Sequence, residues 1–170
     1  LDAGKSWTKA TAIASYEWQF HDGSRASGAR VTRRYQRAGT YSEILKVTDR
    51  EGHVDYDFAI VQVIDQQHPE QLPSTIHPNY FPTTGIRIGT PVMFKVRTFR
   101  TTAAQETWDF GDGSPRVTVQ SDGNAVKHAP DGYAVTTHRF RKAGHHVIRV
   151  EHTNQHGLRA IGHLHVEVAE

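Results

Sequence analysis

Short runs of alternating apolar and polar residues follow one another along the chain, and most runs end at turn-forming residues. Trp18 and Phe20 alternate in one run, and Val92, Phe94 and Val96 alternate in another. A period of two residues places every second side chain on the same face of a β-strand. No stretch shows the period of an amphipathic helix, so the pattern predicts an all-β protein with frequent tight turns.

The pattern occurs twice. Residues 16–24 match residues 106–114 at an offset of 90, and residues 34–63 match residues 139–168 at an offset of 105. The second copy therefore contains an insertion of 15 residues. We expect one sandwich over residues 1–65, a Pro-containing linker over 66–78, and a second sandwich over 79–170 with an inserted hairpin or loop at about 115–133.

The first copy is expected to be incomplete at its N-terminus. By offset, Leu1 lies near the end of the second strand of the other copy, so about one and a half strands are missing. We interpret this as truncation of a longer parent chain. The alternative is that an upstream segment or another subunit supplies the strand by edge pairing.

Composition excludes several classes of function. The net charge is only +2, which does not predict a nucleic-acid-binding protein. The absence of Cys excludes disulfides, thiolate catalysis and Cys-based zinc sites. No apolar run approaches the roughly 18 residues of a membrane span.

The repeated residues resemble the polycystic-kidney-disease (PKD) domain family. The resemblance rests on Trp108-Asp-Phe-Gly-Asp-Gly-Ser114, Thr137-His-Arg-Phe140, Ala143-Gly144 and Thr153-Asn-Gln-His-Gly157, and on the corresponding residues of the first copy. It implies two tandem immunoglobulin-like β-sandwiches. It also implies a non-catalytic accessory module of a secreted or cell-surface bacterial protein, which contacts a neighbouring domain, another protein or a polysaccharide.

The shared motif is interpreted as structural. Its tryptophans occupy the position of an immunoglobulin-type core residue, and its carboxylates precede turn glycines, where they cap backbone N–H groups. A sugar-stacking role for the tryptophans and an acid/base role for the carboxylates are the less favoured readings. The motif residues are Trp18, Phe20, Asp22 and Gly23 in the first copy and Trp108, Asp109, Phe110, Asp112 and Gly113 in the second.

Two departures affect ligand expectations. Gln19 stands where the second copy has Asp109, so one carboxylate is missing. The loops before the Trp strands also lack the carboxylates of a calcium site, and no metal or other cofactor is expected.

His163 and His165 alternate on the last strand and are interpreted as solvent-facing. Glu43 falls on an otherwise apolar face, where either Arg33, Arg34 or Lys46 pairs with it or the missing strand leaves it open.

The insertion is the most individual feature, because loops on rigid sandwiches often bind ligands. From the PKD resemblance we expect a non-catalytic spacer or interaction module within a larger polysaccharide-active enzyme. The alternative is a carbohydrate-binding module that uses exposed aromatic residues and the insertion residues Arg116, Lys127, His128 and Tyr133.

Overall fold

The computed structural model describes residues 1–9, 12–101, 104–121 and 133–170, with Ala104 and Ser121 described by their backbone alone. All regular elements in these ranges are strands. They are β1 (Ile13–Gln19), β2 (Arg25–Ser27), β3 (Gly39–Asp49), β4 (Val54–Val63), β5 (Thr75–Phe81), β6 (Val92–Phe99), β7 (Ala104–Asp109), β8 (Val117–Ser121), β9 (Ala134–His138), β10 (Gly144–Thr153) and β11 (Arg159–Val168). The predicted all-β class is confirmed.

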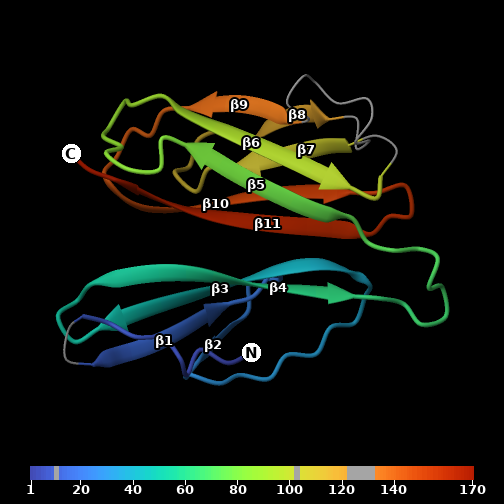
Figure 1. Cartoon of the computed structure of the whole chain (residues 1–170), viewed down its shortest axis with the longest axis horizontal. Coiled ribbons are helices and arrows are strands. Elements are labelled where there is room, and N and C mark those ends of the chain that lie inside the picture. The colour runs from blue at the N-terminus through green and yellow to red at the C-terminus, as the bar shows by residue number, and fades with distance from the viewer. Residues whose placement is uncertain (10–11, 102–103, 122–132) are drawn as a thin grey trace.

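Copy two is a complete sandwich. A small sheet in the order β5-β6-β9 packs against strands β11, β10, β7 and β8 (Figure 1). Its core includes Trp108, Phe94 and Phe140, all fully buried. β5 begins at Thr75, within the stretch that the sequence assigned to the linker. The second sandwich therefore begins before residue 79, where the sequence analysis had placed its start.

Within the described residues, copy one has a multi-stranded sheet in only one layer, the one equivalent to β11, β10, β7 and β8. Strands β2, β1, β3 and β4 pair antiparallel in that order. The opposite face of its core is covered by Leu1–Ala3, which pairs with residues 29–31 through backbone hydrogen bonds and an isolated bridge between Asp2 and Arg30. The smaller core contains Ala3, Trp18, Phe20 and Leu45.

The two copies share one eight-stranded sheet. β11 pairs parallel with the start of β3 through Arg159–Gly39 and Ala160–Thr40. In Figure 1, β11 accordingly runs along the boundary between the copies. A Cβ atom at Gly39 would lie only 2.9 Å from the backbone oxygen of Arg159, so the close approach of the strands requires glycine there.

Candidate functional site: the junction and cleft between the repeats

The linker is hydrogen-bonded to both copies. The hydroxyl of Thr40 in copy one donates to the backbone oxygen of Ser74 over 2.6 Å, and the side-chain amide of Asn154 in copy two donates to the backbone oxygen of Leu72 over 3.2 Å. Thr40, Ser74 and Asn154 are all buried. Buried hydrogen bonds of this kind oppose free rotation of one copy against the other, because breaking them leaves polar groups unsatisfied.

Histidine and aromatic side chains fill the junction. Phe58 of copy one stacks on His163 at a ring-centroid distance of 5.7 Å, and Tyr56 lies 4.7 Å from His165. Both histidines point away from the core of copy two, as their alternation indicates. The prediction that they face solvent is wrong for His163, which is 7% exposed. The reason is that copy one covers this face of β11.

Burial changes the titration of these histidines. Desolvation, with a contribution from the Arg149 guanidinium, lowers the pKa of His163 to about 4. Burial also lowers the pKa of His165, and the neighbouring His145 adds to this effect. The Nδ1 atom of His145 lies 2.9 Å from the Nε2 atom of His165. The junction therefore favours neutral imidazoles near neutral pH.

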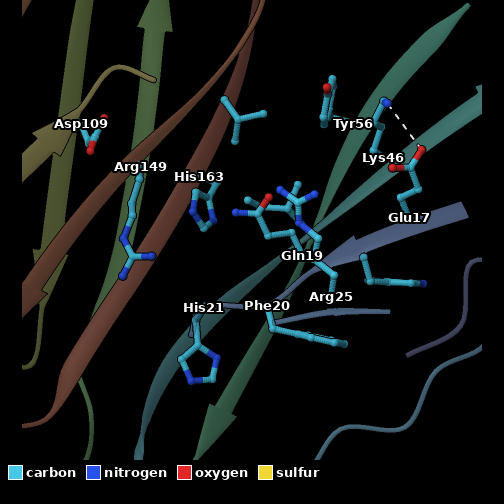
Figure 2. Close-up of a pocket in the computed structure, with 13 residues that line it drawn as sticks. Glu17, Gln19, Phe20, His21, Arg25, Lys46, Tyr56, Asp109, Arg149 and His163 are labelled. Atoms are coloured by element: carbon cyan, nitrogen blue, oxygen red, sulfur yellow. Dashed lines mark hydrogen bonds and ion pairs between the residues drawn. The ribbon is translucent and has the colours of Figure 1, made fainter. Parts of the chain in front are cut away.

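A cleft of about 430 Å³ opens beside the junction, and we call it the inter-repeat cleft. Figure 2 shows side chains from both copies around it, with the Lys46–Glu17 ion pair on one side and Asp109 and Arg149 on the other. Its lining residues are Glu17, Trp18, Gln19, Phe20, His21, Arg25, Ile44, Lys46, Tyr56, Asp109, Val147, Arg149 and His163.

Most charges of the inter-repeat cleft are already paired. The N···O distances are 3.4 Å for Lys46–Glu17, 2.8 Å for Arg149–Glu151 and 3.2 Å for Arg116–Asp109. Within the described ranges, Arg25 has no ion-pair partner, so it is available to an acidic group. The arrangement suits a polar contact with another molecule. It does not present the unengaged pair of carboxylates that glycoside hydrolysis needs.

The aromatic residues of the repeated motif lie in the two cores. Trp18 and Phe20 are buried in copy one, and Trp108 and Phe110 are buried in copy two. The indole N–H of Trp18 donates to the backbone oxygen of Gly28 over 3.0 Å. These rings have no exposed face on which a sugar could stack, so their burial favours the structural interpretation.

The carboxylates of the motif stabilise turns by accepting hydrogen bonds from backbone N–H groups. Asp22 accepts hydrogen bonds from the backbone and hydroxyl of Ser24 and pairs with Arg33, next to Gly23 with its positive φ of 85°. Asp112 accepts the backbone N–H of Ser114 over 3.0 Å and contacts His138 over 2.7 Å. Burial alone would raise the pKa of Asp112, but these hydrogen bonds lower it to about 2. A carboxylate with so low a pKa is unsuited to act as a general acid near neutral pH.

The predicted binding residues of the insertion are only partly described. Arg116 precedes β8 and pairs with Asp109 at the edge of the large sheet. Tyr133 precedes β9 in the small sheet, with Lys95 Nζ 5.6 Å from its ring centroid. Arg116 and Tyr133 therefore belong to different layers of the sandwich. Lys127 and His128 lie outside the described residues, and the binding role of all four stays a prediction.

Sequence reasoning missed the partner of Glu43. This carboxylate is fully buried and accepts two hydrogen bonds from His21, 2.6 Å from its backbone nitrogen and 2.8 Å from its Nδ1 atom. The partners predicted from the sequence, Arg33, Arg34 and Lys46, do not pair with it. In copy two the equivalent backbone N–H belongs to Gly111, and it donates to the carboxylate of Asp109. In copy one, Glu43 on β3 therefore supplies the carboxylate that Asp109 supplies in copy two. The presence of Gln19 in place of an Asp was the sequence signal that could have indicated this replacement.

Metal ligands do not converge in the part of the chain that the structure describes. No group of three or more His, Asp or Glu side chains there is placed to hold a metal ion. No helix in those ranges has the length and apolar character needed to cross a membrane.

Comparison with known proteins shows relatives of each copy. The PKD domain family matches residues 1–63 and, separately, residues 78–166. Collagenase ColA of Clostridium perfringens (strain 13 / Type A) is 31% identical over 67 residues, which are 39% of this chain and 6% of the collagenase. The chain therefore spans only a small part of this relative.

Solved structures with related folds were also found. The PKD domain of an M14-like peptidase from Thermoplasmatales archaeon SCGC AB-540-F20 is 22% identical, with a TM-score of 0.42, over 57% of this chain and 96% of that domain. The PKD domain of the human VPS10 domain-containing receptor SorCS2 is 21% identical, with a TM-score of 0.43, over 64% of this chain and 81% of that one.

These findings define the class of the protein as all-β, with tandem immunoglobulin-like sandwiches. More specifically, the chain belongs to the PKD domain family and contains two PKD domains in tandem. PKD domains are non-catalytic modules, and the partial match to a much longer collagenase is consistent with a module of a larger protein.

Proposed function

We propose that this chain is a rigid spacer that holds neighbouring parts of a larger bacterial protein, secreted or displayed at the cell surface, in a fixed relative orientation. The observation that supports this most directly is the junction, where β3 and β11 pair and the linker is bonded to both copies. Two domains on a flexible linker would not share a sheet. The parent is proposed to be an enzyme that degrades a polymer: the PKD resemblance favours a polysaccharide, whereas the collagenase relative favours a protein.

Rigidity can be measured by spin labelling, because the chain has no native Cys. With labels at Glu51→Cys and Lys142→Cys, one on each copy, we expect a single narrow distance distribution by electron–electron double resonance. Gly39→Val should broaden it, because the added Cβ would meet the backbone oxygen of Arg159. Thr48→Val, at the far end of the same strand, should leave it narrow. A broad distribution in the unsubstituted labelled chain would contradict the rigid-spacer proposal.

A second candidate function is carbohydrate binding, and one observation favours it. Trp7 is 77% exposed and lines a groove of about 570 Å³ that also contains Glu51, His53 and Asp55. An exposed indole beside carboxylates offers a stacking surface and hydrogen-bond acceptors to a sugar.

The test for this candidate is a polysaccharide pull-down with matched aromatic variants. We expect Trp7→Ala to reduce retention at least ten-fold and Phe81→Ala, which removes another exposed aromatic ring, to leave it unchanged. Arg116→Ala and Tyr133→Ala report separately on the insertion. If the unsubstituted chain is not retained by any polysaccharide, this second candidate is wrong and the spacer proposal is unaffected.

A further inference from the structure

A groove of about 780 Å³ lies at one end of the copy-two sandwich, and we call it the basic groove. Three segments form its walls: residues 88–89 between β5 and β6, residues 112–115 after β7, and residues 137–142, which run from the end of β9 toward β10. This is the end at which β5 and β9 finish, on the left in Figure 1. The basic groove shares no lining residue with the inter-repeat cleft or with the groove that contains Trp7.

Hydrogen bonds connect the three walls of the basic groove. The Arg139 guanidinium donates to the backbone oxygen of Gly89, and the backbone N–H of Gly89 donates to the oxygen of Phe140 over 2.9 Å. The Nε2 atom of His138 lies 2.7 Å from the carboxylate of Asp112, which ties the second wall to the third. The shape of the basic groove is therefore set in the free protein, and this lowers the entropic cost of binding a ligand there.

The rim of the basic groove carries three cations. Arg139, Arg141 and Lys142 are all exposed, and none of them forms an ion pair within the described ranges. Among the described residues that line the basic groove, the one carboxylate is that of Asp112, which His138 already engages. Three like charges within four residues of one segment create a positive local potential. The basic groove therefore favours an anionic partner.

The lining between these cations is apolar and offers no aromatic platform. Ile88 is 47% exposed, and Pro115 is also exposed. Phe140 is fully buried, and the ring of His138 stacks on Phe110 at a centroid distance of 4.0 Å. A sugar ring would lack the exposed aromatic face on which it could stack. An aliphatic side chain flanked by carboxylates matches both the apolar lining and the cationic rim.

We propose that the basic groove binds an acidic peptide segment of a partner protein, in which one aliphatic side chain is flanked by Glu or Asp residues. The aliphatic side chain packs on Ile88 and Pro115, and the flanking carboxylates face Arg141 and Lys142. Charge complementarity of this kind gives specificity and a high association rate, and the apolar contact adds affinity. The inference does not depend on either function proposed above.

Two fluorescein-labelled peptides provide the probe. One has a central Leu with two Glu on each side, and the other has Gln in place of every Glu. Fluorescence anisotropy with the full chain should show that the Glu peptide binds at least ten-fold more tightly than the Gln peptide. Raising the NaCl concentration from about 50 mM to about 500 mM should weaken binding of the Glu peptide at least five-fold, because salt screens exposed charges.

Variants at exposed positions assign the binding to the basic groove. The double variant Arg141→Glu and Lys142→Glu should weaken binding of the Glu peptide at least ten-fold. The matched control, Arg34→Glu and Arg37→Glu, makes the same charge change in the corresponding segment of copy one at the 105-residue offset and should leave binding unchanged. Ile88→Ser should weaken binding about five-fold. Circular dichroism checks that each variant remains folded.

Several results would overturn the proposal. They are absence of binding of the Glu peptide at millimolar concentration, equal affinity for the Glu and Gln peptides, equal losses in the two double variants, and an affinity that Ile88→Ser leaves unchanged. Polygalacturonate is the remaining arm of the test. If it binds in a manner that depends on Arg141 and Lys142 while the Glu peptide does not bind, the partner is an acidic polysaccharide instead.

Discussion

His21→Ala is expected to lower the free energy of unfolding by about 3 kcal/mol, because it removes the side-chain partner of a fully buried carboxylate. Of the two hydrogen bonds that residue 21 donates to Glu43, only the one from its backbone N–H would remain. The loss of the ring also removes the contact with Tyr41, whose centroid lies 4.2 Å away. Urea denaturation followed by tryptophan fluorescence measures the effect.

A transplant from copy two is the matched control for this prediction. The combination Gln19→Asp, His21→Gly and Glu43→Ile reproduces Asp109, Gly111 and Ile148 of copy two, where the turn is bonded by Asp109 and no carboxylate is buried on the neighbouring strand. We expect the triple variant to recover to within about 1 kcal/mol of the original chain, since no unpaired buried group remains. If His21→Ala is neutral, or the triple variant is no better than the single one, the pair does not stabilise copy one.

Acidification is expected to destabilise the protein between about pH 6.5 and pH 4, before the carboxylates protonate. The folded-state pKa of His163 is lowered to about 4 from an unperturbed value of 6.5, so in this window the unfolded chain binds a proton that the folded chain does not. The contribution is fully present above pH 6.5 and amounts to about 3 kcal/mol over the full shift. His165, whose pKa is also lowered, acts in the same direction.

His163→Gln separates this effect from general acid denaturation. We expect the variant to lose most of the slope of unfolding free energy against pH between pH 6.5 and 4, whereas His68→Gln, at an exposed linker position, should keep it. The lowered pKa values of Asp49 and Asp112, both about 2, place the loss of their contributions below this window. Parallel curves for the original chain and His163→Gln would show that His163 does not titrate as inferred.

The contrast between the two copies explains which parts of the site were predictable. Burial of Trp18 and Trp108, and the turns at Asp22 and Asp112, follow from local periodicity and turn chemistry, which the sequence displays directly. The insertion residues Arg116 and Tyr133 were grouped only by proximity in sequence, and the fold places them in different sheets. Proximity along a loop does not determine which layer of a sandwich a side chain joins.

The sequence by itself determined that this protein is all-β, that it contains two related copies, and that Gln19 has lost a carboxylate, because strand alternation and repetition are properties of the chain order. Only the tertiary structure decided that Glu43 supplies a carboxylate to His21, that His163 is buried, and that the two copies share one sheet. Each of these depends on contacts between residues of different strands or different copies. No local period encodes such contacts: the Glu43–His21 pair forms only when copy one folds, and the burial of His163 follows only when the β3–β11 pairing joins the two copies.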